Sequence, residues 1–196
     1  MPTSTADLIV GVDEAGVGCW AGCCFVAAVA IDRGVILPEC VKDSKCVSDI
    51  RMARAVVQRS AAHIFVERAS VRLINDLGIW NAWQRAMKTL LGRVERLDAN
   101  LEVIIDGNRP VPGRMGRCVP RADKTIPVVG AASIVAKDEQ LWSMWVADQR
   151  HPEYGFDQHH GYGTSQHREA LETHGICDLH RTGYKPIKAV LEARRP

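Results

Sequence analysis

Apolar and polar residues follow two different periods along the chain. The apolar runs 8–12 and 23–31 are rich in β-branched residues and are separated by a glycine-rich segment, which predicts a hairpin that feeds a central sheet. The expected turn of this hairpin carries the carboxylates of Asp13 and Glu14. Residues 64–69 alternate as a strand does, and a short apolar run at 101–105 ends directly before Asp106.

Apolar residues at helical spacing predict four helices, over residues 48–62, 76–97, 165–174 and 187–193. Ser48 is the expected cap of the first of them, and Asp49 suits the positive end of its dipole. The segment 119–129 is predicted as loop and strand with Asp123 inside it. The small residues that follow it suit the start of a helix packed closely against backbone. Strands interleaved with helices predict an α/β fold.

Length and composition limit the class of protein. The chain has 196 residues, of which 46% are hydrophobic and 24% charged, as in an ordinary globular protein with one main domain. The net charge of +2 neither requires nor excludes a polyanionic partner. Seven cysteines are an odd number for a disulfide framework and no apolar signal region is evident, so we expect buried thiols and a cytoplasmic protein. The apolar stretch 20–31 is too short to cross a membrane.

Four acidic residues lie beside glycines or at the expected ends of apolar runs: Asp13, Glu14, Asp106 and Asp123. Hard divalent cations such as Mg²⁺ bind carboxylate and water oxygens, and two ions about 4 Å apart can activate a water and stabilise a leaving oxygen. The other interpretation is that these acids form turns, caps or ion pairs. It is weakest for Asp13 and Glu14, because burying two adjacent negative charges without a cation is costly.

The segment 151–164 is rich in His, Gly and Tyr. An aromatic ring between glycines, as at Tyr162, can stack on a sugar or a base. Zinc ligation by His159, His160 and His167 is a second hypothesis, and an ordinary surface loop is a third. Basic residues that could hold phosphates, or be plain solvated charge, gather in two groups: Arg109, Arg114, Arg117, Arg121 and Lys124, and His180, Arg181, Lys185, Lys188, Arg194 and Arg195.

Several ordered motifs resemble the type 2 ribonucleases H, specifically the bacterial ribonuclease HII family. The motifs cover nearly the whole chain: Gly11-Val12-Asp13-Glu14-Ala15-Gly16, Asp43-Ser44-Lys45, 75–87, Ile105-Asp106-Gly107-Asn108, 131–137, and Tyr154-Gly155-Phe156 through Thr164. The resemblance implies an RNase H-like mixed central sheet flanked by helices, with a helical C-terminal extension. We expect a catalytic core over residues 1–145, and a substrate-binding loop and helical extension over 146–196.

The resemblance also implies a reaction. A metal-dependent endonuclease of this family hydrolyses the RNA strand of RNA–DNA hybrids and incises duplex DNA 5′ to embedded ribonucleotides, with Mg²⁺ or Mn²⁺, leaving a 3′-hydroxyl and a 5′-phosphate. Its partner is therefore a hybrid or a ribonucleotide-containing duplex, and we expect a monomer without membrane association. Carried over by position, the catalytic metal ligands are Asp13, Glu14, Asp106 and Asp123, with Asp13 bridging both ions. The implied substrate contacts are Gly16, Val17, Gly18, Lys45, Ser133 and Tyr162.

Three departures from the family pattern affect the substrate contacts and leave the acids intact. Val17 stands where the family usually has arginine between the two glycines, so a guanidinium contact is lost. Residues 138–141 lack the usual Arg-Asp pair, and His160 replaces a lysine. Two alternatives therefore stay open: a catalytically weakened hybrid-binding protein on the same scaffold, and a broader nuclease that also cuts all-DNA duplexes.

Overall fold

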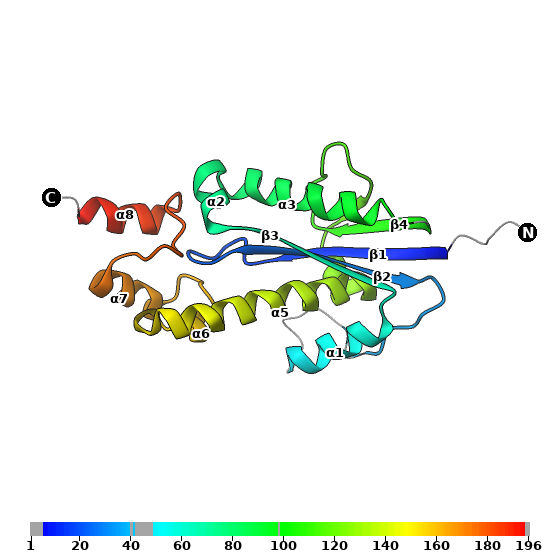
Figure 1. Ribbon diagram of the computed structural model, residues 1–196, viewed down its shortest axis with the longest axis horizontal. Helices are drawn as coiled ribbons and strands as arrows, with labels where there is room; N and C mark the ends of the chain where they lie inside the picture. The colour runs from blue at the N-terminus through cyan, green and yellow to red at the C-terminus, as the bar shows by residue number, and fades with distance from the viewer. Residues whose placement is uncertain (1–5, 40, 42–48, 98, 195–196) are drawn as a thin grey trace, which may run out of the picture. The chain divides into compact units, whose positions relative to one another are not determined.

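A computed structural model describes residues 6–39, 41, 49–97 and 99–194. The elements in this part of the chain, shown in Figure 1, are β1 (Ala6–Ala15), β2 (Cys24–Asp32), α1 (Ile50–Ser60), β3 (His63–Ala69), α2 (Val71–Leu77), α3 (Ile79–Val94), β4 (Ala99–Asp106), β5 (Arg117–Val119), α4 (Ala122–Thr125), α5 (Pro127–Arg150), a 3₁₀ turn (Pro152–Tyr154), α6 (Phe156–His159), α7 (Ser165–His174) and α8 (Lys185–Ala193).

The strands form one mixed sheet in the order β3-β2-β1-β4-β5. Strand β1 runs antiparallel to β2 and parallel to β4, and β4 runs parallel to β5. Such a sheet needs cover on both faces, because its central strands are apolar on both sides. The predicted mixed sheet flanked by helices is confirmed.

Strand β1 is longer than its apolar run indicates. Asp13 and Glu14 pair with Ala27 and Val26 of β2, so both acids lie within the strand. The prediction that they lie in the turn is wrong, because backbone hydrogen bonding to β2 continues past the last apolar side chain. The two carboxylates are therefore held by a strand in the middle of the sheet.

Contacts between residues divide the described part of the chain into two compact units. Among the described residues, the first unit lies within 6–15, 25–67 and 86–138, and the second lies within 16–24, 68–85 and 139–194. In the first unit, α1 and the beginning of α5 cover one face of the sheet and the end of α3 lies on the other (Figure 1). Small residues bring α5 close: a Cβ on Gly11 of β1 would lie 2.2 Å from the carbonyl oxygen of Val128.

Helix boundaries differ from the sequence predictions at three places. The expected helix 76–97 is two helices, because α2 ends at Gly78 with φ +78° and α3 begins after it. Asp123 lies on the short helix α4, and α5 already begins at Pro127. The prediction of loop and strand over 119–129 is therefore wrong after Val119. Asp49 caps α1 by accepting from the N–H of Met52 at 3.0 Å, whereas Ser48, the cap predicted from the sequence, lies outside the described residues.

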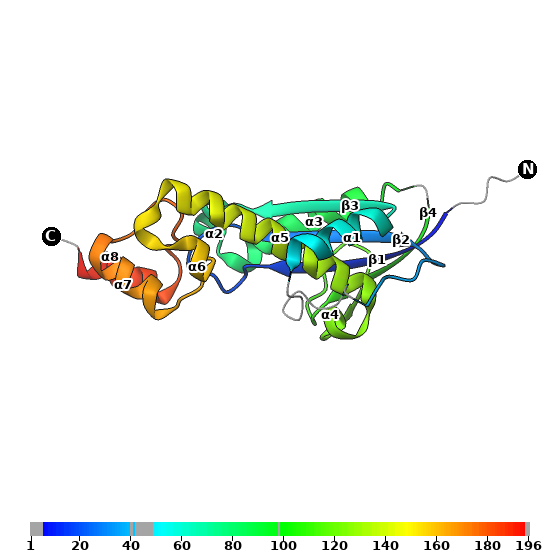
Figure 2. The ribbon, with the colours of Figure 1, turned by 90° about the horizontal axis from the view of Figure 1, so that it is seen from below.

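The second unit has its own core. Side chains from the end of α5, the 3₁₀ turn, α6, α7 and α8 pack around Tyr154, Phe156 and Leu171, and Figure 2 shows these last helices gathered together. The Gly-rich segment 16–24 joins this core through Ala21, which pairs with His180 in an isolated β-bridge. No helix in the described ranges is long and apolar enough to cross a membrane.

Candidate active site

The sheet register brings the first and third acids together. Val12 of β1 is paired with Ile105 of the neighbouring parallel strand β4, so Asp13 and Asp106 are the next residues on adjacent strands. Neighbouring strands are about 4.8 Å apart. The electrostatic influence of Asp106 on Asp13 agrees with this proximity. Two acids that are 93 positions apart in sequence therefore lie next to each other on two adjacent strands of the sheet.

The fourth acid joins through a turn after β5. The backbone N–H of Asp123 donates to Oδ1 of Asp106 at 3.3 Å. Arg121, directly before α4, adopts a left-handed backbone conformation with φ 58°, which turns the chain from β5 into this short helix. Such a conformation is unfavourable for a residue with a Cβ and is retained only where the surrounding structure enforces it. The turn thus places Asp123 beside Asp106.

Ionisation of Asp13 is disfavoured by its surroundings. Its side chain is 6% exposed, and burial, together with the charges of Glu14 and Asp106, raises its pKa well above the ordinary value. Hydrogen bonds from the Glu14 N–H, at 2.7 Å, and from the Ser133 hydroxyl oppose this shift. Negative charges that are buried and crowded in this way are costly unless a cation compensates them. The residues present therefore fit a hard divalent ion.

Arg181 holds the Gly-rich loop in the second unit. Its side chain is completely buried, and it donates to the carbonyl oxygens of Gly16 (Nη2, 2.7 Å), Val17 (Nη1, 2.9 Å) and Gly22 (Nε, 2.9 Å). The hydroxyl of Tyr184 donates to the Val17 carbonyl as well, at 2.6 Å. A planar guanidinium can satisfy three such oxygens in one plane, which an ammonium cannot do.

This burial corrects the interpretation of the second basic group. His180 and Arg181 are 1% and 0% exposed, so neither belongs to a phosphate-binding surface. Sequence reasoning missed the structural role of Arg181 because a charged residue is usually solvated. Asn75 supports the same segment: its Nδ2 donates to the His180 carbonyl, and its Oδ1 accepts from the N–H of Thr182.

The Gly-Tyr-Gly segment packs directly on the Gly-rich loop. A Cβ on Gly161 would lie 2.4 Å from the carbonyl oxygen of Ala21, and one on Gly163 would lie 2.1 Å from the Trp20 ring. Gly161 also has φ +82°, which favours glycine. The two glycines are required by this close approach, and they set the position of Tyr162 between them.

Tyr162 lies beside the exposed backbone of Gly18. A Cβ on Gly18 would come within 3.9 Å of the Tyr162 ring, which is 40% exposed. Burial of the hydroxyl end, with Cys19 nearby, raises the pKa of Tyr162 to about 12, so the phenol stays protonated. Gln140, another residue that sequence reasoning missed, is buried here and donates to the His160 carbonyl at 3.1 Å, next to Cys19. The partly exposed Tyr162 thus lies beside the exposed backbone of Gly18.

Three histidines of the second unit, His159, His167 and His180, are buried and hydrogen-bonded. His167 Nδ1 donates to the Tyr162 carbonyl, so its Nε2 accepts from Nε2–H of His180 at 3.1 Å. His180 can donate there because its Nδ1 accepts from the N–H of Cys177. His159 donates through Nε2 to the backbone and stacks on His167 with ring centroids 4.3 Å apart. The ring nitrogens of His159 and His167 are therefore engaged, and these rings form part of the core; they do not join His160 in a zinc site.

The predicted site residues fall into two groups. In the first unit, Glu14 and Asp106 act electrostatically on Asp13, Ser133 of α5 hydrogen-bonds to Asp13, and the backbone N–H of Asp123 donates to Asp106. The second unit brings together the other substrate-contact candidates, Gly16, Val17, Gly18 and Tyr162. Lys45 lies outside the described residues.

Comparison with known proteins gives a consistent result over almost the full length. A model of the family described as ribonuclease HII matches residues 10–187. The ribonuclease HII of Neisseria meningitidis serogroup B is 38% identical over 189 residues, which cover 94% of this chain and 95% of that protein. A crystal structure of ribonuclease H2 from Pyrococcus horikoshii superposes with a TM-score of 0.82 at 20% identity, covering 95% of this chain and 98% of the other. The crystal structure of Bst-RNase HIII in complex with Mn²⁺ superposes with a TM-score of 0.70 at 20% identity, covering 97% of this chain and 71% of that chain.

Proposed function

The chain belongs to the ribonuclease HII family and is a ribonuclease H, and from that premise we propose that it also incises duplex DNA on the 5′ side of embedded ribonucleotides, using two divalent metal ions. The observation that carries the proposal is the buried Asp13, crowded by Glu14 and Asp106 and in need of positive charge. Membership of the family by itself supports the more general activity, hydrolysis of RNA in RNA–DNA hybrids.

The proposed metal ligands are Asp13, Glu14, Asp106 and Asp123. Mg²⁺ or Mn²⁺, when bound, would supply an activated water and stabilise the leaving oxygen. The structure of Bst-RNase HIII with Mn²⁺ makes a divalent ion a reasonable choice for this fold. Asp13 is our candidate for the bridging ligand, because it has acidic neighbours on its own strand and on β4.

The hydrogen bonds around Asp13 and Asp106 orient the carboxylates. The N–H of Glu14 and the hydroxyl of Ser133 both donate to the Asp13 carboxylate, and the N–H of Asp123 donates to Asp106. These bonds fix each carboxylate in one orientation before any ligand arrives, which lowers the reorganisation that binding requires. In this proposal Ser133 positions Asp13, and contact with a substrate phosphate is not needed to explain its burial.

The proposed substrate contacts are the Gly16–Gly18 backbone and the Tyr162 ring. Arg181 and Tyr184 occupy carbonyl oxygens in this loop, so we expect its N–H groups to bind the ribose hydroxyl or phosphate of the substrate. The exposed face of Tyr162 is suited to pack against the ribose, where the 2′-hydroxyl distinguishes RNA from DNA.

A matched set of duplexes tests the proposal. The protein is incubated in Mg²⁺ or Mn²⁺ with three labelled duplexes that differ only in sugar: all DNA, DNA with one ribonucleotide, and a continuous RNA–DNA hybrid. We expect a cut 5′ to the single ribonucleotide, none in all-DNA duplex, and a loss of at least about 100-fold in Asp106→Asn. Cleavage of the hybrid alone would reject incision at single ribonucleotides.

The two alternatives predict different outcomes in the same assay. A weakened binding protein would bind the hybrid and the ribonucleotide-containing duplex with salt-dependent affinity, and would show no metal-dependent turnover above that of Asp106→Asn. A broad nuclease would cut the all-DNA duplex at a comparable rate. The Val17→Arg variant separates loss of the guanidinium contact from loss of the metal site, because it restores the usual family residue and leaves the four acids unchanged.

A further inference from the structure

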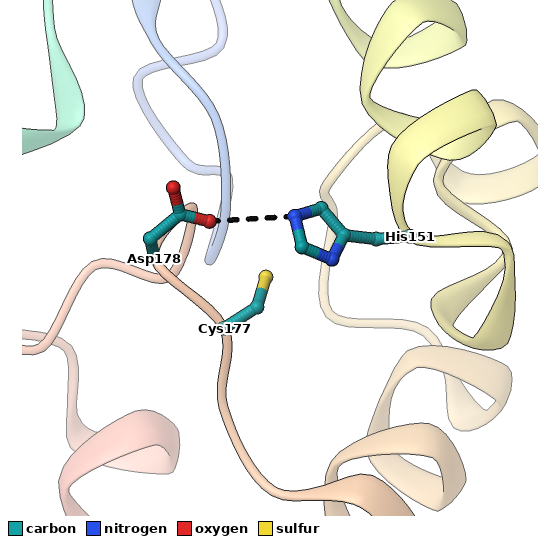
Figure 3. Close-up of side chains that lie close together, drawn as sticks. All are labelled: His151, Cys177 and Asp178. Carbon is teal, nitrogen blue, oxygen red and sulfur yellow. Dashed lines mark ion pairs between the residues drawn. The ribbon is translucent and has the colours of Figure 1, made fainter.

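A second group of potential metal ligands lies in the second unit. Its ligand atoms are of three types, whereas those of the acidic residues are all carboxylate oxygens. His151, directly after α5, and Cys177 and Asp178, in the connection between α7 and α8, each place one ligand atom within 4.8 Å of the others. Figure 3 shows the three side chains converging from these two segments. Within the described residues, this is the one group of three or more His, Cys, Asp and Glu side chains that meets this criterion.

We propose that His151, Cys177 and Asp178 form a zinc site with the fourth coordination position left for water. Imidazole nitrogen, thiolate sulfur and carboxylate oxygen are the three ligand types that Zn²⁺ takes from proteins, normally in tetrahedral geometry. A thiolate ligand disfavours Mg²⁺ and Mn²⁺, which prefer oxygen. The ligand set therefore selects a different class of ion from that expected at the acidic cluster.

The distances fit such a site after small side-chain movements. His151 Nε2 lies 3.4 Å from Asp178 Oδ1, close to the separation of about 3.4 Å that zinc bonds of about 2.1 Å impose on two tetrahedral ligands. The side chain of Asp178 is 70% exposed and can adjust freely. Cys177 Sγ lies 3.3 Å from His180 Nδ1, and a zinc–sulfur bond would replace that contact.

A neighbouring carboxylate supports the histidine ligand. Glu153 Oε1 lies 3.6 Å from Nδ1 of His151, on the opposite nitrogen from the one that faces Asp178. Carboxylate, histidine and metal in this order are a common arrangement, in which the carboxylate fixes the tautomer and orientation of the ring. Glu153 is thus placed to orient His151 with Nε2 toward the ion.

Zinc at this position would connect two segments that the chain separates by 26 residues. Cys177 and Asp178 lie three or four positions before Arg181, which holds the Gly16–Gly22 loop. An ion that binds only the folded chain stabilises the fold, because the site is absent from the unfolded chain. The site would therefore restrain the connection that carries Arg181.

Cobalt substitution tests the proposal without any activity measurement. The metal-free protein, in the Asp106→Asn background, is titrated with Co²⁺, which gives a thiolate charge-transfer band only when a cysteine sulfur binds it. We expect that band with intense tetrahedral bands in the visible, loss of both on adding Zn²⁺, and loss of the band in Cys177→Ser. Cys118→Ser, which changes another half-buried free cysteine, serves as the control and keeps the band.

The exposed Asp178 keeps the test decisive if Cys177→Ser does not fold. Asp178→Asn should weaken Zn²⁺ binding about tenfold or more, while Asp76→Asn, another exposed acid of the same unit, should bind Zn²⁺ as the parent does. Absence of the thiolate band in the parent protein, its persistence in Cys177→Ser, or unchanged affinity in Asp178→Asn would each overturn the proposed site.

Discussion

Arg181 Nη2 donates to the carbonyl oxygen of Gly16 at 2.7 Å, although the two residues are 165 positions apart in the chain. The bond ties the C-terminal part of the second unit to the loop that directly follows the Asp13-Glu14 pair in sequence. Because Arg181 is completely buried and uses three of its nitrogens on loop carbonyls, the loop conformation depends on the shape of the guanidinium as well as on its charge.

Replacing Arg181 by lysine should separate geometry from charge. Arg181→Lys keeps the charge and leaves buried carbonyls of the loop without a donor, which costs about 1–3 kcal/mol for each unsatisfied group. We expect a loss of about 3 kcal/mol in the free energy of unfolding, measured with urea, and a rise in KM for a ribonucleotide-containing duplex with a smaller change in kcat.

The control for this prediction is Arg194→Lys. Arg194 also donates to two backbone carbonyls, but it is exposed, so water can replace the lost bonds and the cost should stay below about 1 kcal/mol. Equal effects of the two substitutions would show that the burial of Arg181 is not important.

Replacing Asp13 by asparagine should remove activity and stabilise the metal-free protein at neutral pH. The raised pKa of Asp13 means that the folded state favours the protonated carboxyl, so ionisation costs stability as pH rises from the ordinary aspartate pKa through the raised one. Asp13→Asn avoids that cost. Thermal unfolding in chelator should show a higher midpoint for the variant at pH 7, and the difference should vanish in acid.

With added Mg²⁺ or Mn²⁺, the parent protein should have the higher midpoint of thermal unfolding and Asp13→Asn the lower. The parent should gain stability from the ion, whereas Asp13→Asn should gain little because its ligand is lost. Asp32→Asn, at the exposed end of β2, is the matched control and should leave both measurements unchanged. A lower midpoint for metal-free Asp13→Asn at pH 7 would contradict the predicted crowding.

Alanine at Gly163 should disturb the Tyr162 loop. The added Cβ would lie 2.1 Å from the Trp20 ring, so the loop or the ring must move, at a cost of about 1–3 kcal/mol. Gly183→Ala is the control in the same unit, because a Cβ there has no heavy atom within 4 Å. Urea unfolding of both variants measures the difference, and equal stability of the two would contradict the close approach.

Protonation of His167 should destabilise the fold in acid. Burial lowers the pKa of His167 to about 4, so its neutral form is favoured, and this contribution to stability is complete above about pH 6.5 and is lost as pH falls through 4. His167→Gln should therefore flatten the dependence of unfolding free energy on pH between 6.5 and 4. His63→Gln, an exposed histidine on β3, should leave that dependence as steep as in the parent.

Local patterns along the chain were enough to predict most of the helices and strands and the chemistry of the acidic residues. Apolar runs located the strands around the first acids and Asp106, and helical spacing located α7 and α8, because side-chain periodicity depends on neighbours in the chain. The acidic residue types at strand ends were enough to predict a cation site. The ordered motifs were enough to indicate the family.

Which residues share an environment follows from long-range contacts that the local patterns do not contain. The register of β1 against β4 set Asp13 beside Asp106, and the turn at Arg121 placed Asp123 on a helix where loop and strand were expected. The burial of Arg181 and the requirement for glycine at position 163 both depend on segments far away in the chain. Such contacts are not encoded in local periodicity, because their energies come from packing and hydrogen bonds that exist only once distant segments have met.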